Sequence, residues 1–208
     1  MNPIFSRNEN VNKIAFLNWR ISYDNEIRNL LNIADGFMLS SIRLAKLCLI
    51  NNGDKSADIL IFPILTNANH GIELYLKAIM WTLNKLMNSD SKIEGSHNIK
   101  QIFETVESKI KIYKGKISLE IFQESMLEVK AYITELFDKI NATPQKDKMD
   151  FSRYPFNNKY ENHFYVDIIG NVEVDLENFV SRFELIRQTF ENMSDFLIYK
   201  ELYNDEEL

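Results

Sequence analysis

The chain has little cysteine, glycine or proline. Its 208 residues include one cysteine, six glycines and four prolines. A single cysteine excludes an intrachain disulfide, and Cys48 has apolar neighbours, so we expect it to pack as a small hydrophobic residue in the core. Glycine and proline favour tight turns, and the chain has few of either. This scarcity argues against a β-sandwich and favours long helices.

Long apolar runs and an excess of positive charge are also missing. No stretch of about 18 apolar residues occurs, so we expect no membrane span. The first residues lack the apolar core of a secretory signal, which makes the cytoplasm the expected location. The formal net charge of −6 disfavours broad, non-specific binding to nucleic acid, but it leaves room for a local basic groove.

Apolar residues recur every three or four positions over most of the chain, which is typical of amphipathic helices. We expect helices over about residues 22–50, 56–87, 96–115, 119–140 and 175–200, with Ser96 and Asp175 as caps of two of them. Pro63 lies too deep for a first-turn proline, so it predicts either a kink or a later start of the second helix.

Residues 141–175 differ from the helical part in composition. We expect a polar loop first and then a short β-hairpin near residues 163–175. The sequence therefore predicts an all-α protein, an up-and-down bundle of about five long helices with one small hairpin insertion. We expect a single domain over residues 1–208, with its core at about 22–140 and 175–200.

Three polar side chains interrupt the mostly apolar helix around residues 68–79. His70, Glu73 and Lys77 are spaced three and four residues apart, so they share one helix face. Polar groups inside an apolar helix cost free energy unless they find partners. We therefore expect either a buried polar network or a binding site. The simpler alternative is a solvated Glu73–Lys77 pair at a helix edge.

Two residues elsewhere in the chain are candidate partners of Glu73. His97 opens the next helix, which we expect to run antiparallel to the first. Arg153 is a lone arginine among aromatic residues in the loop that follows the fourth helix. A buried carboxylate needs partners of this kind. The candidate binding residues are therefore His70, Glu73, Lys77, His97 and Arg153.

Sequence signatures of metal and cofactor sites do not occur. The three histidines and Cys48 lack the close spacing of metal ligands, so we expect no metal site. The chain also lacks a glycine-rich phosphate loop and a nucleophile elbow. We expect no cofactor and assign no catalytic residue.

The polar face nevertheless belongs to a pattern that resembles a known family. The pattern A-x-H-G-I-E-L-x-L-K-A over residues 68–78, with G-S-H-N-I over 95–99 opening the next helix, resembles bacterial HEPN-like helical proteins. The Arg-Tyr-Pro element at 153–155 is similar to a subset of that group. The resemblance covers roughly residues 56–200 and implies an α-helical bundle that often forms homodimers.

Many HEPN proteins are metal-independent ribonucleases whose active site is an arginine followed by four to six residues and a histidine. This chain lacks that motif, because its nearest pair, Arg153 and His163, has nine residues between them. The resemblance therefore implies the non-catalytic branch of the family, whose members bind nucleotides, RNA or protein partners. The expected function is a binding or regulatory module in bacterial defence or a toxin–antitoxin system.

Two alternatives remain open at the level of sequence. The first is a divergent, metal-independent ribonuclease in which Arg153, His97 and Glu73 converge in space. Wide separation of Arg153 from His97, or burial of both in the core, would exclude it. The second is a purely structural interaction protein in which the polar cluster only fixes the register of the helices.

Overall fold

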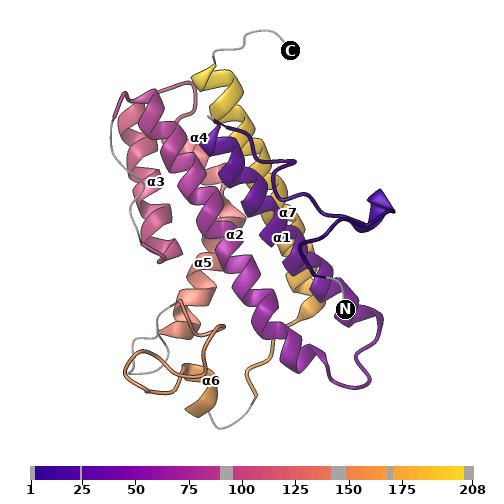
Figure 1. Cartoon of the computed structure of the whole chain (residues 1–208). Helices are drawn as coiled ribbons and strands as arrows, with labels where there is room; N and C mark the ends of the chain where they lie inside the picture. The colour runs from indigo at the N-terminus through magenta and orange to yellow at the C-terminus, as the bar shows by residue number, and fades with distance from the viewer. Residues whose placement is uncertain (1–2, 24, 90–95, 142–148, 168–170, 204–208) are drawn as a thin grey trace.

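Helices dominate the structure, and they pack around one long central helix, α2 (Figure 1). The structure, a computed structural model, describes residues 3–23, 25–89, 96–141, 149–167 and 171–203. The elements are a 3-10 turn η1 (Val11–Lys13), α1 (Glu26–Ile50), α2 (Ala57–Leu86), α3 (Ile99–Tyr113), α4 (Leu119–Ser125), α5 (Leu127–Ile140), α6 (Phe164–Asp167), α7 (Leu176–Asp195) and a π-helical end η2 (Phe196–Leu202). The all-α prediction is confirmed, since the described residues contain no strand.

The helix starts show how the local sequence specifies these elements. The side chain of Asp175 accepts a hydrogen bond from the Asn178 amide, so the expected cap of α7 is confirmed. The expected cap of α3 is wrong, because Asn98 rather than Ser96 caps the helix. Pro63 lies inside α2, which excludes a later start of that helix. The carbonyl that Pro63 leaves without a helical donor is that of Ile59, an exposed residue that water can reach.

Helices α1 and α2 are antiparallel, and side-chain contacts show their register. Ser41 Oγ donates to the carbonyl of Ile64 at 3.0 Å, while Tyr75 Oη donates to Asp35 Oδ1 at 3.3 Å. Residue numbers therefore fall along one helix as they rise along the other. Figure 1 shows α7 beside α1 and running in the same direction as α2.

The direction of α3 differs from the sequence prediction. His97, just before α3, contacts Glu73 in the middle of α2, and Tyr113 at the end of α3 contacts Glu201 in η2. Helix α3 therefore begins beside the middle of α2, and it runs parallel to α2 and α7. Strict up-and-down order is therefore not observed. Periodicity could not show this, because it defines the buried face of a helix and not its direction.

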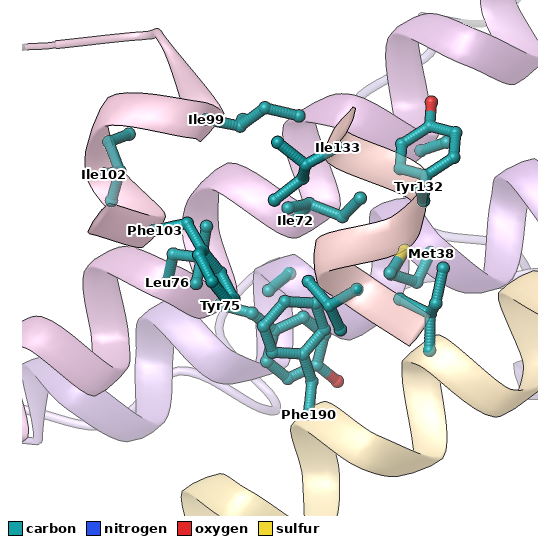
Figure 2. Packing of buried hydrophobic residues seen from close by; sticks show 14 of the residues in the cluster. Met38, Ile72, Tyr75, Leu76, Ile99, Ile102, Phe103, Tyr132, Ile133 and Phe190 are labelled. Carbon is teal, nitrogen blue, oxygen red and sulfur yellow. The ribbon is translucent and has the colours of Figure 1, made fainter. Parts of the chain in front are cut away.

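Residues from five helices interdigitate in the core (Figure 2). Helix α2 contributes Ile72, Tyr75 and Leu76, all of which are buried. Around them lie Met38 of α1, Ile99, Ile102 and Phe103 of α3, Tyr132 and Ile133 of α5, and Phe190 of α7. The rings of Tyr75 and Phe190 stack with centroids 4.9 Å apart. Cys48 is also buried, as expected.

Gly71 allows the close approach of α1 to α2. A Cβ atom at this position would lie 2.7 Å from Met38 Cγ and 3.2 Å from the Met38 backbone nitrogen. Real Cβ contacts are not this short, so a larger residue would force the two helices apart or displace Met38. This packing explains the glycine between His70 and Glu73 in the sequence, on the face of α2 that meets α1.

The helix expected over residues 119–140 is divided into α4 and α5. The backbone at Met126 leaves the helical region (φ −95°, ψ 14°), and both helices meet there. Apolar spacing continues through the break, because Phe122, Met126 and Val129 are all buried. The sequence pattern therefore gave no sign of it.

The β-hairpin expected near residues 163–175 is not observed. Phe164–Asp167 form a short helix, α6, and residues 171–175 are not in a strand, while the expected turn at 168–170 lies outside the described residues. Consecutive side chains of a strand point to opposite faces. Here Phe164 packs on Phe151 and Tyr165 on Phe62, so both neighbours face the protein. Tertiary packing overrides the weak strand pattern.

A membrane span is not found either. None of the helices in the described ranges has the length and apolar character needed to cross a bilayer.

Candidate functional site

Four residues form a polar cluster on the central helix, which we name the Glu73 cluster: His70, Glu73, Lys77 and His97. Lys77 Nζ lies 2.8 Å from Glu73 Oε1, and His97 Nδ1 lies 2.9 Å from the same oxygen. His70 Nδ1 lies 3.5 Å from Glu73 Oε2. Each histidine and the lysine therefore contacts one carboxylate.

Local sequence explains how these side chains meet. His70, Glu73 and Lys77 lie one turn apart on α2, so they share one face. Asn98 caps α3, and buried Ile99 anchors its first turn against the core. His97 immediately precedes this cap, which places its ring over the α2 face.

The cluster is buried at Glu73 and opens to solvent at the histidines. Side-chain exposure is 6% for Glu73 and 12% for Lys77, but 38% for His70 and 66% for His97. The Glu73–Lys77 ion pair is thus the buried part of the site, and the two imidazoles form its solvent-exposed edge. A solvated Glu73–Lys77 pair, the simpler alternative, is excluded by this burial.

The partners of Glu73 hold it in the charged state. Burial by itself would raise the pKa of the carboxyl group, but hydrogen bonds from His70, Lys77 and His97 and the charge of Lys77 outweigh it. The pKa falls from its ordinary value of 4.5 to about 2. An ionised carboxylate only accepts hydrogen bonds, so Nδ1 of His97 carries the proton that it donates to Glu73.

Arg153 reaches the same place from a distant part of the chain. Thr66 of α2 fixes the preceding residue, because its Oγ1 lies 2.9 Å from Ser152 Oγ and 3.1 Å from the Ser152 carbonyl oxygen. Buried Phe151 anchors the segment, and the Arg153 amide donates to the carbonyl of Asp150 in a turn. The Arg153 side chain itself is exposed.

A small polar cleft joins these elements. Its volume is about 20 Å³, enough for one water molecule or one oxygen atom of a ligand. We name it the Glu73 cleft, and its lining residues are Thr66, Asn69, His70, Glu73, His97, Met149, Ser152 and Arg153. Lys77 lies behind it, paired with Glu73.

The structure thus brings the five predicted residues to one place. His70, Glu73, His97 and Arg153 line the Glu73 cleft, and Lys77 contacts Glu73. Sequence reasoning missed Thr66, Asn69 and Ser152. Thr66 and Asn69 carry a signal that could have been found, because they extend the polar face of α2 by the same helical spacing. Ser152 carries none, since loop residues have no periodicity.

Asn69 is one of the buried residues that line this cleft. The phenol of Tyr132 donates to Asn69 Oδ1 at 2.8 Å, and both residues are buried. Burial raises the pKa of the Tyr132 phenol, so its proton stays in place to make this bond. Nδ2 of Asn69 has no hydrogen-bond partner within the described ranges.

The described residues contain no group of three or more His, Cys, Asp or Glu residues arranged to hold a metal ion. His163, one of the residues considered for such a site, is buried, and its Nε2 lies 4.0 Å from Asp150 Oδ1.

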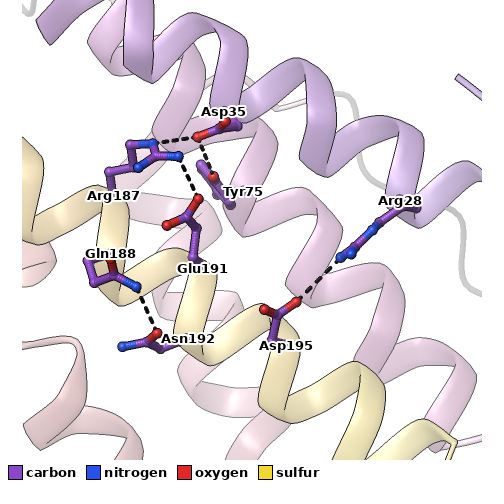
Figure 3. Close-up of polar contacts among 8 residues, drawn as sticks. All are labelled: Arg28, Asp35, Tyr75, Arg187, Gln188, Glu191, Asn192 and Asp195. Atoms are coloured by element: carbon purple, nitrogen blue, oxygen red, sulfur yellow. Dashed lines mark hydrogen bonds and ion pairs between the residues drawn. The ribbon is translucent and has the colours of Figure 1, made fainter. Parts of the chain in front are cut away.

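A second polar network joins α1, α2 and α7 (Figure 3). Arg187 donates to Asp35 Oδ1 at 2.5 Å and to Glu191 Oε1 at 2.6 Å, and Tyr75 donates to the same Asp35 oxygen. Burial and the Asp35 charge both raise the pKa of the Tyr75 phenol. Every group here is paired with another, so we assign the network to helix packing and not to ligand binding.

Comparison with other proteins gives no assignment. No protein-family model, curated protein or solved structure matches the chain. The chemistry of the Glu73 cleft is therefore the basis for a functional proposal.

Proposed function

We propose that this protein is a non-catalytic, HEPN-like binding module that recognises a phosphate group of RNA or of a nucleotide at the Glu73 cleft. The observation that carries the proposal is the convergence of Arg153 and His97 on one small polar cleft from separate parts of the chain. A ligand oxygen placed there lies next to several hydrogen-bond donors.

Charge at the cleft favours an anion. Lys77 neutralises the charge of Glu73 within the buried ion pair. Arg153 forms no ion pair within the described ranges, so its exposed guanidinium adds a positive charge to the lining of the cleft. Arginine is well suited to phosphate oxygens. A local positive site of this kind is compatible with the acidic chain as a whole, because attraction is set by nearby charge.

The state of Glu73 argues against cleavage by this residue. A carboxylate whose pKa is about 2 is a weak base, and its oxygens already accept hydrogen bonds from three side chains. Together with the missing arginine–histidine motif, this supports binding without catalysis. In this proposal Glu73 orients the donors around it.

A second candidate function, a divergent metal-independent ribonuclease, is favoured by one specific contact. Glu73 accepts the Nδ1 proton of His97, whose side chain is two-thirds exposed. A carboxylate that fixes the tautomer in this way leaves Nε2 as a base, and Arg153 lines the same cleft. The ribose 2′-hydroxyl would be the nucleophile. Arg153 and His97 are exposed and line the same cleft, so this alternative is not excluded by wide separation or by burial in the core.

One experiment distinguishes the two candidates. A fluorescein-labelled single-stranded oligoribonucleotide is titrated with protein in EDTA, and anisotropy and gel electrophoresis are followed on the same samples. We expect binding without cleavage, and roughly tenfold weaker binding for Arg153→Ala. Arg43→Ala, which removes an exposed arginine of α1, is the matched control and should bind like the wild type.

Two outcomes would reject the proposal. Cleavage that is lost in His97→Gln and Arg153→Ala would establish the ribonuclease. Absence of binding to the oligoribonucleotide and to AMP would leave the third alternative, a structural interaction protein. In that case Glu73→Gln and Lys77→Met would change stability and leave association with a protein partner intact.

The family resemblance also suggests an oligomeric state and a biological role for the protein. We propose a homodimer, with a protein partner or RNA as the regulated component of a bacterial defence or toxin–antitoxin system. Light scattering coupled to gel filtration tests the first part. A mass equal to one chain at all concentrations would overturn it.

A further inference from the structure

Asn69 lines the Glu73 cleft and carries a buried hydrogen-bond donor that has no partner among the described residues. The residue is 5% exposed, and its Oδ1 accepts the proton of Tyr132 from α5. Its Nδ2 has no hydrogen-bond partner in the described part of the chain. A buried donor left unpaired destabilises a fold, so this arrangement requires an explanation.

Tyr132 determines which end of the amide is available. A buried phenol must donate its proton, and Asn69 Oδ1 is the acceptor that the structure gives it. Turning the amide over would place Nδ2 beside the phenol and leave the phenol proton without that acceptor. The contact therefore fixes the side chain with Nδ2 as the free group.

The other polar atoms of the cleft narrow the choice of ligand. The hydroxyl groups of Thr66 and Ser152 lie within hydrogen-bond distance of each other, and the oxygens of Glu73 already accept from its cluster. Nδ2 of Asn69 is a buried donor without an acceptor, and the exposed guanidinium of Arg153 supplies further donors. A volume of about 20 Å³ admits a single oxygen atom but excludes a nucleobase.

We propose that Asn69 is a recognition residue that donates from Nδ2 to a non-bridging phosphate oxygen, which enters the Glu73 cleft in place of water. The rest of the phosphate group then lies outside, at the edge formed by His97 and Arg153. This inference rests on the proposed function and identifies Asn69 as the residue that donates a hydrogen bond to the ligand oxygen. Tyr132 acts as a positioning residue, because it reaches the ligand only through Asn69.

The test uses the full chain and three probes: inorganic phosphate, AMP and a short oligoribonucleotide without a terminal phosphate. Isothermal titration measures affinity for the wild type, Asn69→Asp, Asn69→Ala and Tyr132→Phe. Asn69→Asp keeps the acceptor for Tyr132 and replaces the free donor with an oxygen. Asn67→Asp adds the same charge to α2 two residues away, at a position that does not line the cleft.

We expect at least about tenfold weaker binding for both Asn69 variants, since they lose a hydrogen bond to a charged group. Tyr132→Phe should weaken binding less, and Asn67→Asp should bind like the wild type. In protein labelled with ¹⁵N-asparagine, the Asn69 side-chain amide, identified by its loss in Asn69→Asp, should shift on addition of AMP. Thermal melting of each variant shows whether it is folded.

The outcomes separate this inference from the proposed function. If the wild type binds and Arg153→Ala weakens binding, but the Asn69 variants bind normally and the amide signal does not move, the inference is wrong and the function stands. Binding of AMP without the unphosphorylated oligoribonucleotide assigns the site to terminal phosphates, and binding of both assigns it to any phosphate. If no probe binds, both are wrong.

Discussion

Glu73 Oε1 accepts hydrogen bonds from Lys77 Nζ at 2.8 Å and from His97 Nδ1 at 2.9 Å, so one buried oxygen joins α2 to the start of α3. The same carboxylate therefore stabilises the fold and positions His97 at the cleft. Variants at this residue should separate the two roles.

Glu73→Gln should destabilise the protein by roughly 2–4 kcal/mol, because it leaves Lys77 largely buried without its counter-charge. Urea unfolding followed by circular dichroism measures the change. Adding Lys77→Met to Glu73→Gln should restore part of the loss. The control is Glu184→Gln, which removes an exposed pair with Lys46 and should cost less than about 1 kcal/mol. Equal effects at the two sites would show that Glu73 is not buried in solution.

Stability should also depend on pH through Glu73. Its pKa is about 2 in the folded protein and near 4.5 otherwise. A lowered pKa stabilises the fold fully above pH 4.5, and this contribution is lost as the pH falls toward 2. The difference between wild type and Glu73→Gln should therefore shrink by roughly 3 kcal/mol over that range. A difference that stays constant from pH 6 to 2.5 would contradict this result.

Gly71→Ala should destabilise the protein by about 1–3 kcal/mol, since the added methyl group would lie 2.7 Å from Met38 Cγ. Gly36→Ala on α1 is a close control, because its Cβ would meet no atom within 4 Å. That change should stabilise the helix by up to about 1 kcal/mol. Opposite signs in thermal melting support close packing of α1 on α2, and two stabilised variants would refute it.

Arg187→Met should lower the free energy of unfolding by about 2 kcal/mol. Asp35 and Glu191 would lose the positive charge that both of them pair with. Burial already raises the pKa of Glu191, an effect that Arg187 opposes. Arg28→Met breaks the exposed pair with Asp195 and should cost less than about 1 kcal/mol. Chemical denaturation of both variants provides the comparison, and similar losses would argue against a structural role for the network.

The sequence predicted the helices better than their arrangement. Apolar spacing is a local property, so the buried faces of α1, α2 and α7 could be read from it. The direction of α3 depends on where the chain returns after α2, and the pattern does not contain this information. The expected hairpin failed because Phe164 and Tyr165 both pack on the protein, a tertiary effect that local alternation cannot show.

The site was predictable where it lies on a helix. His70, Glu73 and Lys77 share a face by spacing alone. The cost of burying a carboxylate pointed to two candidate partners of Glu73. Of these, His97 contacts Glu73, whereas Arg153 lines the same cleft without a described contact to the carboxylate. Asn69 was missed because its importance comes from Tyr132 on α5, which occupies one end of its amide. Such a contact depends on the packing of helices and not on the order of residues.

Binding of a phosphate at the Glu73 cleft can be measured by titrating ¹⁵N-labelled protein with AMP and following the amide chemical shifts. We expect saturable shifts concentrated at the backbone of His97, Ser152 and Arg153, which lie at the Glu73 cleft. Shifts centred on a distant surface, or none at millimolar AMP, would contradict binding at this cleft.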